Sequence, residues 1–139
     1  MEIPTPAQVD AFVTEHYPAM AGAGYRCESM GAGRARARWT HDETTLRPGG
    51  LISGPTQFAA ADLALWFLSF TIVGLQPMAV TSDLSITFLR PAAGGDLVAD
   101  AVLLRAGRSR ISGRVDISVV GDDRLVAHAT GSYAVLAER

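Results

Sequence analysis

One carboxylate, Asp62, lies inside an otherwise apolar stretch of the chain. From Phe58 to Val73 the only other polar residues are Ser69 and Thr71. Burial without compensation costs a carboxylate several kcal/mol, so a chain seldom keeps one there without a partner or a task. Asp62 is therefore the first candidate for a catalytic acid, base or nucleophile. The alternative is a structural carboxylate hydrogen-bonded to a serine or threonine.

A helix is predicted to begin at Pro55 and to carry Asp62. Proline suits the first turn of a helix, because its missing N–H would have no partner there and its φ is already helical. Asp62 lies about two turns further on and projects on the same side as the helix start. The start of a helix offers free N–H groups and a positive dipole end, which suit a polarised carbonyl or an oxyanion. The two features together predict that a carbonyl bound at the helix start meets a carboxylate nearby.

The apolar stretch is long enough to cross a bilayer, but its composition favours the core of a folded domain. Asp62 would be costly in lipid, Pro77 interrupts the run, and no Lys or Arg flanks it closely. We therefore expect a buried helix wrapped by a sheet, and no membrane partner.

Composition narrows the function further. The length of 139 residues predicts one domain over 1–139. The net charge of -2 gives no sign of the basic surface that nucleic-acid binding needs. All 12 basic residues are Arg, which excludes chemistry that needs a lysine. The lone Cys27 and the scattered His16, His41 and His128 predict no disulfide, metal or other cofactor. The first residues lack the pattern of an export signal, so a cytoplasmic location is expected.

Periodicity predicts an α+β fold. Thr5 to Gln8 has the form of a capping box, which starts an N-terminal helix within residues 1–20 that Pro18 ends. Alternation over 33–39 predicts a strand with three arginines on a solvated face. After the central helix, strands are predicted as an antiparallel meander over 80–89, 96–105, 110–119 and 125–135.

The motif Ser53-Gly54-Pro55 with Asp62 resembles the hotdog-fold acyl-CoA thioesterases of the phenylacetate-pathway type, in which His-Gly-Gly precedes an acid at the same spacing. The segment DLSITFLRP, residues 83–91, is similar to the strand after the helix in that family, and the resemblance covers roughly residues 30–136. It implies a hotdog fold, in which a curved antiparallel sheet wraps a long central helix. It also implies a homodimer, or a tetramer of two dimers, with active sites between subunits.

The resemblance also implies roles for individual residues. Asp62 is the nucleophile or general base, and the N–H groups of Gly54 and Thr56 bind the thioester oxygen. Ser53 stands where the family has His, so it is expected to orient a carbonyl or a water. The substrate is a thioester of CoA or of an acyl-carrier protein. Thr81 and Ser82 are expected to contact the attacking water or Asp62. Phe58, Leu65 and Trp66 are expected around the acyl chain, and Gln57 either in the acyl pocket or at the dimer interface. Arg108 and Arg110 are expected to contact the CoA phosphates.

Two other functions stay open at this point. One is a hotdog hydratase or dehydratase, a class that pairs an acid with a His near the helix, where this sequence has none. The other is a protein that binds an acyl ligand without cleaving it, which replacement of the family His by Ser53 makes credible.

Overall fold

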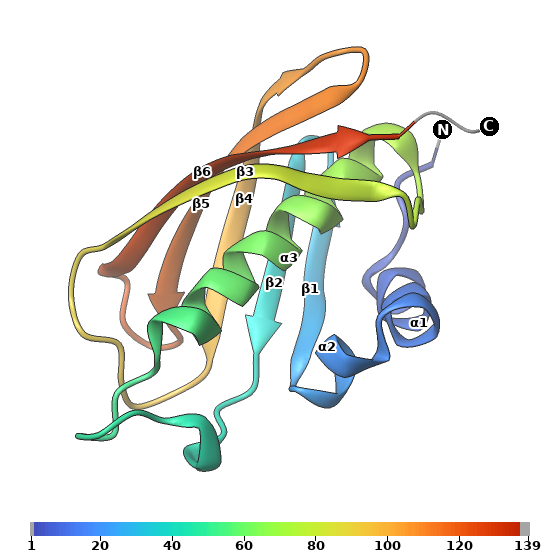
Figure 1. Cartoon of the computed structure of the whole chain (residues 1–139). Coiled ribbons are helices and arrows are strands. Elements are labelled where there is room, and N and C mark those ends of the chain that lie inside the picture. Colours follow the sequence, from blue (N-terminus) through green and yellow to red (C-terminus); the bar gives the residue numbers. More distant parts are fainter. Residues whose placement is uncertain (1, 137–139) are drawn as a thin grey trace.

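The apolar stretch that carries Asp62 forms the long helix α3, Gly54–Val73. A computed structural model, which describes residues 2–136, shows α3 lying against the concave face of a six-stranded antiparallel sheet (Figure 1). By length and composition α3 could cross a membrane, but 67% of its most apolar window is buried inside the protein. The expected hotdog arrangement, a core helix wrapped by a curved sheet, is confirmed.

The sheet contains one strand that the sequence analysis missed, β1, and one strand, β3, that lies at an unexpected position. Its order is β1-β2-β4-β5-β6-β3. Strands β4 to β6 form the predicted meander, but β3 pairs with β6 at the far edge instead of with β4. The elements are α1 Pro6–His16, α2 Pro18–Gly22, β1 Tyr25–Gly31, β2 Arg34–Trp39, the 3-10 turn η1 Glu43–Thr45, α3, β3 Ala79–Phe88, β4 Leu97–Ala106, β5 Arg110–Val119 and β6 Leu125–Val135.

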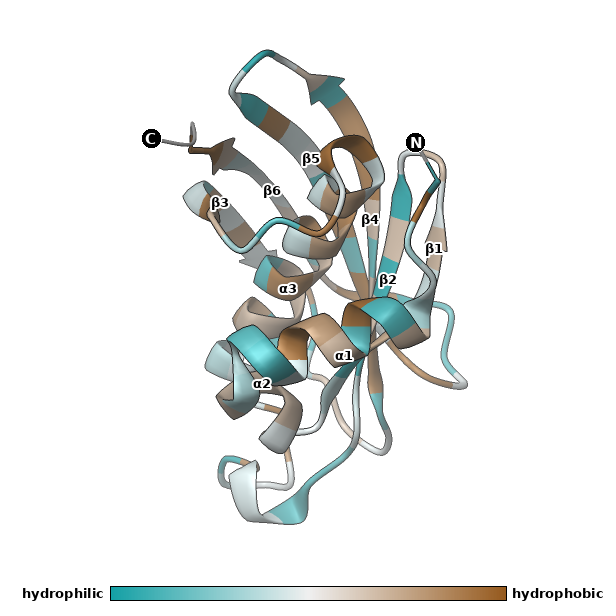
Figure 2. Ribbon diagram, turned by 90° about the vertical axis from the view of Figure 1, so that its right-hand side faces the viewer, coloured by the Kyte–Doolittle hydropathy of each residue, from teal (hydrophilic) through white to brown (hydrophobic). Residues whose placement is uncertain are grey.

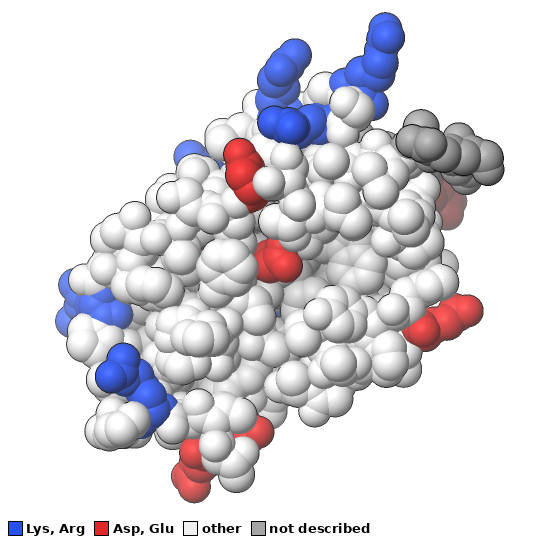
Figure 3. Space-filling model, in the orientation of Figure 1, with Lys and Arg blue, Asp and Glu red and all other residues white. Residues whose placement is uncertain are grey.

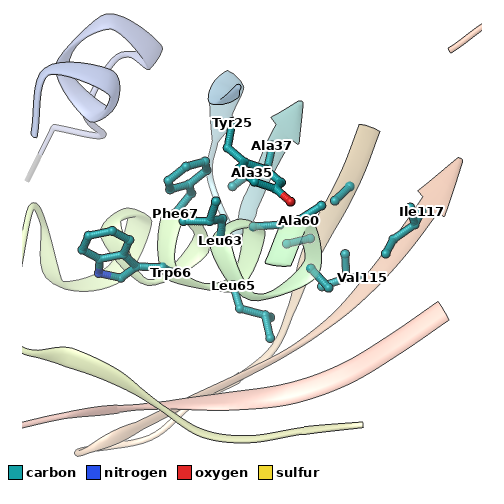
Figure 4. Close-up of a cluster of buried hydrophobic side chains, with 14 of the residues drawn as sticks. Tyr25, Ala35, Ala37, Ala60, Leu63, Leu65, Trp66, Phe67, Val115 and Ile117 are labelled. Carbon is teal, nitrogen blue, oxygen red and sulfur yellow. The ribbon is translucent and has the colours of Figure 1, made fainter. Parts of the chain in front are cut away.

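Two glycines let α3 approach the sheet closely. A Cβ on Gly113 would lie 2.6 Å from a methyl group of Leu68 and 3.0 Å from one of Leu65, and a Cβ on Gly131 would lie 2.9 Å from the other Leu65 methyl. Strand interiors use glycine where another element comes this near. Figure 4 shows Leu65 directed from α3 toward the strands. Leu65 is therefore a core residue that fixes the height of α3 above β5 and β6.

The N-terminal helices lie beside α3 and next to β1 (Figure 2). The predicted capping box of α1 is present, with Thr5 accepting from the Gln8 N–H and the Gln8 side chain accepting from the Thr5 N–H. Pro18 does more than end α1, because it takes the first-turn position of a second helix, α2. The Phe12 and Phe70 rings pack edge to face with their centroids 5.5 Å apart, and this contact anchors α1 on the central helix.

The arginine row of β2 is not simply solvated, contrary to the prediction. Arg36 pairs with Asp100 at 2.6 Å and with Glu28 at 3.2 Å, and Arg38 pairs with Glu28 at 2.7 Å and with Asp96 at 2.9 Å. The partners come from β1, which the sequence analysis missed, and from β4 or the residue just before it. This network of ion pairs links three neighbouring strands on one face of the sheet.

The ion pairs predict a pH-dependent contribution to stability. Hydrogen bonds from Arg38, and then Arg36, hold the pKa of Glu28 below its usual value of 4.5. A carboxylate with a depressed folded-state pKa stabilises the fold above its unfolded pKa, and that stability is lost as the pH falls through the folded value. We expect Glu28→Gln to lower the free energy of unfolding by about 1 kcal/mol at neutral pH. The difference should close as the pH falls below 4.5.

Denaturant unfolding of wild type and Glu28→Gln across this pH range measures the effect. Glu43→Gln is the control, because Glu43 is exposed and forms no ion pair among residues 2–136. An equal loss at every pH, or none at neutral pH, would contradict the prediction.

Candidate active site

The Asp62 carboxylate is half-buried on α3 and is held by two hydroxyl groups from the sheet. Thr81 on β3 donates to Asp62 Oδ1 at 2.6 Å, and Tyr133 on β6 donates to the same oxygen at 2.8 Å. Thr81 and Tyr133 are partners in the β3–β6 ladder, so the two donors lie side by side. Among residues 2–136 Oδ2 accepts no hydrogen bond. The carboxylate is thus anchored by one oxygen, while the other is available for chemistry.

Asp62 opens onto an apolar cavity of about 460 Å³, called the Asp62 cavity below. It lies between α3, the junction of α1 and α2, and the start of β3. Trp66 in its wall is fixed by a hydrogen bond from its ring N–H to the Gln76 carbonyl, at 3.3 Å. The cavity is lined by His16, Tyr17, Met20, Phe58, Ala59, Asp62, Leu63, Trp66, Pro77, Ala79, Val80, Thr81 and Tyr133.

Tyr133 and His16 are among the residues of this cavity that the sequence analysis missed. Tyr133 is only 5% exposed, and its inward position within the last strand was the only signal for it. Burial raises the pKa of Tyr133, and the Asp62 charge raises it further, so its hydroxyl keeps its proton. His16 comes from α1, far from Asp62 in sequence but in the wall of the same cavity. The absence of a local His therefore no longer argues against hydratase chemistry.

A β-bulge sets the direction of the Thr81 side chain. The β3–β6 register shifts between Thr81 and Asp83, which leaves Ser82 as the extra residue. Thr81 reaches Asp62, whereas Ser82 is exposed and is absent from the lining of the cavity. Of the two predicted partners of Asp62, the structure brings only Thr81 to it.

The start of α3 leaves one main-chain donor rather than two. The helix begins at Gly54, one residue before the predicted start, and Ser53 is its N-cap. The Ser53 Oγ accepts from the Thr56 N–H at 3.2 Å, so this N–H is already satisfied, and Pro55 has none. The Gly54 N–H donates to no acceptor within residues 2–136. The Thr56 N–H, predicted as an oxyanion donor, is therefore taken up by the N-cap bond to Ser53, which leaves Gly54 with the free N–H.

Gly54 and Asp62 face different hollows of the chain. Gly54 lies against the Phe88 ring, which a Cβ on Gly54 would approach to 3.2 Å. It lines a second concavity of about 620 Å³, the Gly54 hollow, together with Arg47, Leu51, Ile52, Pro55, Gln57, Phe88, Leu89, Arg90, Pro91 and Ala92. Eight residues of helix separate the two groups by roughly 12 Å along the axis. Within one chain, a carbonyl at Gly54 cannot meet Asp62, contrary to the sequence prediction.

The other predicted contacts divide between the two hollows and the core. Phe58 and Trp66 line the Asp62 cavity, but Leu65 packs on the sheet instead. Gln57 is buried at the Gly54 hollow and donates to the Ile52 carbonyl at 3.2 Å. Arg108 and Arg110 belong to the β4–β5 hairpin and line neither hollow. Figure 3 shows basic side chains grouped over this hairpin, at the edge of a face whose middle is mostly uncharged but carries acidic side chains.

No group of three His, Cys, Asp or Glu side chains within residues 2–136 could hold a metal ion.

Comparison with known proteins identifies relatives of the same architecture. The family model described as Thioesterase superfamily matches residues 49–127. The esterase-named protein SSO1253 of Saccharolobus solfataricus is 29% identical over 116 residues, which cover 83% of this chain and 75% of that protein.

Two solved structures extend the likeness over the fold. A thioesterase-named crystal structure from Silicibacter sp. TM1040 shares 31% identity and a TM-score of 0.88, covering 99% of this chain and 96% of the other. The phenylacetic acid degradation protein PaaI of Thermus thermophilus, solved as a variant, shares 28% identity and a TM-score of 0.74, covering 86% and 99%.

Proposed function

Because this chain belongs to the thioesterase superfamily and is a thioester hydrolase, we propose that it cleaves an acyl-CoA to the free acid and CoA, with Asp62 as the catalytic carboxylate. One observation carries the proposal. Asp62 has one oxygen held by two hydroxyl donors and the other available beside an apolar cavity. A cavity of about 460 Å³ has room for an acyl group, with Phe58, Leu63 and Trp66 as its apolar walls.

In this reaction the carboxylate accepts one proton and later gives it up. Asp62 Oδ2 takes a proton from water as the water oxygen bonds to the thioester carbon. The tetrahedral intermediate then breaks its C–S bond, and the proton passes to the departing sulfur. Direct attack by Oδ2 would instead expel the thiolate and form an anhydride, which water then hydrolyses to the same products.

We propose that a second copy of the chain completes each site. Strand β3 is an edge of the sheet, and several large apolar side chains are exposed on it or at its ends: Met78 52%, Val80 42%, Phe88 50% and Leu89 54%. An exposed apolar edge strand invites pairing with another chain. Two copies of β3 paired antiparallel about a two-fold axis would join the two sheets edge to edge.

This pairing would bring together the groups that one chain keeps apart. If the axis passes near Leu84 and Ser85, the Thr81 end of one β3 lies opposite the Phe88 end of the other. Thr81 contacts Asp62, and Phe88 contacts Gly54. The Gly54 N–H of one subunit would then lie close to the partner's Asp62, where it can stabilise the oxyanion of the same thioester.

Arg108 and Arg110 remain proposed contacts for the CoA phosphates. Arg110 is paired with Ala134, the neighbour of Tyr133, so the hairpin lies at the end of β6 that holds Asp62. Guanidinium groups bind phosphate oxygens through paired hydrogen bonds. Arg47 and Arg90, which line the Gly54 hollow, are a second possible pair for the same phosphates.

Thiol release from a panel of short, medium, long and aromatic acyl-CoAs tests the proposal. We expect release of one free thiol per acid formed, and the panel to define the acyl class. Parallel assays with enoyl-CoA hydration and with an acyl-carrier thioester separate the alternatives. Hydration without thiol release would indicate a hydratase, and ligand binding without turnover would indicate a binding protein.

A further inference from the structure

We propose that Tyr133 is a positioning residue for the thioesterase reaction, because its hydroxyl clamps Asp62 in the one orientation that presents Oδ2 to the cavity. The inference rests on the proposed role of Asp62.

Tyr133 holds Asp62 at two points. Its hydroxyl lies 2.8 Å from the side-chain Oδ1 and 3.1 Å from the main-chain carbonyl oxygen of the same residue. A donor shared between the two ends of one residue restricts rotation of the side chain that connects them. The other donor, Thr81, reaches only Oδ1.

The two donors differ in how firmly they are held. Tyr133 is 5% exposed, and its strand β6 lies between β5 and β3. An aromatic side chain has few rotatable bonds, so a buried ring keeps its hydroxyl in place at little entropic cost. Thr81 lies next to the bulge at Ser82, where the β3–β6 ladder is interrupted, and it reaches Asp62 only through Oδ1. Tyr133 is thus the rigid support and Thr81 the adjustable one.

The proton needed for this clamp remains on Tyr133 at alkaline pH. Burial and the nearby Asp62 charge both raise the pKa of the Tyr133 hydroxyl. The hydroxyl therefore donates throughout the range in which a carboxylate is an active base. A misplacement of the reacting oxygen by about 1 Å can cost 10²-fold in rate.

The test compares Tyr133→Phe with Tyr25→Phe. Tyr25 is a matched control because it is 8% exposed and its hydroxyl also donates to α3, to the Thr56 carbonyl at 3.0 Å. We expect Tyr133→Phe to lower kcat by roughly 10- to 100-fold with little change in KM, since the substrate walls remain. Tyr25→Phe should lose stability to a similar degree but keep its kcat.

A double-variant cycle distinguishes positioning from general loosening of the fold. In an Asp62→Asn background, Tyr133→Phe should cause no further loss of rate. Equal falls in kcat for Tyr133→Phe and Tyr25→Phe, or additive losses in the cycle, would overturn the proposal. If Tyr133→Phe is too unstable, Tyr133→Met also lacks the donor and can adapt to the space.

Failure of this inference is distinct from failure of the proposed function. If Asp62→Asn is inactive and Tyr133→Phe keeps full kcat, only the role of Tyr133 is lost. If Asp62→Asn keeps full kcat, the catalytic assignment itself fails.

Discussion

Asp62→Asn is expected to lower kcat by about 10²- to 10⁴-fold, the range for loss of a positioned acid–base group. The amide keeps the size of the carboxylate and can still accept hydrogen bonds from Thr81 and Tyr133 through its oxygen. What it lacks is the ability to take a proton from water or to attack the thioester. The binding walls of the Asp62 cavity are unchanged, so KM should change much less than kcat. Steady-state thiol release on the best acyl-CoA of the panel measures both constants.

A matched control separates this effect from a change of charge. Asp123 is exposed in the β5–β6 turn, outside both hollows, so Asp123→Asn should leave kcat and KM unchanged. Circular dichroism and size-exclusion chromatography establish whether each variant keeps the fold and the oligomeric state of the wild type. Full turnover by a folded Asp62→Asn protein would show that the carboxylate has no catalytic role.

Two inactive variants are expected to recover activity when they share a dimer. Gly54→Pro removes the one free N–H at the start of α3, yet proline fits the first turn of a helix. Loss of one oxyanion donor typically costs about 10²- to 10³-fold in kcat. In a mixed dimer of Gly54→Pro and Asp62→Asn chains, one site carries both defects and the other carries neither. With random mixing, about a quarter of wild-type activity should return, because a two-fold interface builds both sites from the same surfaces.

The recovery separates a shared site from a site within one chain. Gly54→Ala is the control for the added atoms, since it keeps the N–H while placing a Cβ 3.2 Å from the Phe88 ring. It should lose less activity than Gly54→Pro. Co-expressed chains with distinct affinity tags allow mixed dimers to be isolated and assayed. No recovery in a purified mixed dimer would mean that Gly54 and Asp62 do not act across subunits.

Several local features could be read from the sequence, because neighbouring residues determine them. The capping box of Thr5 and Gln8, the start of α3 within one residue, and the alternation of β5 are all settled over a few positions. Asp62 stood out for the same reason, as a carboxylate in an apolar helix. The order of these elements predicted an α+β domain, and the family resemblance implied the hotdog fold.

Contacts between distant segments could not be read in this way. β1 was missed because no strict alternation marks it, and its charges make sense only beside β2 and β4. The pairing of β3 with β6 depends on how the sheet curves around α3, which no local pattern encodes. That pairing puts Tyr133 next to Thr81 and under Asp62, a residue 71 positions away.

By itself the sequence determined the central helix, five of the six strands and the candidate catalytic carboxylate, since helix caps and hydrophobic periodicity act over short range. Only the tertiary structure decided what surrounds that carboxylate. It showed that Ser53 is a cap, that Leu65 is core, and that Tyr133 and His16 lie at the Asp62 cavity. It also separated Gly54 from Asp62, because a helix keeps residues two turns apart at a fixed distance whichever face they share.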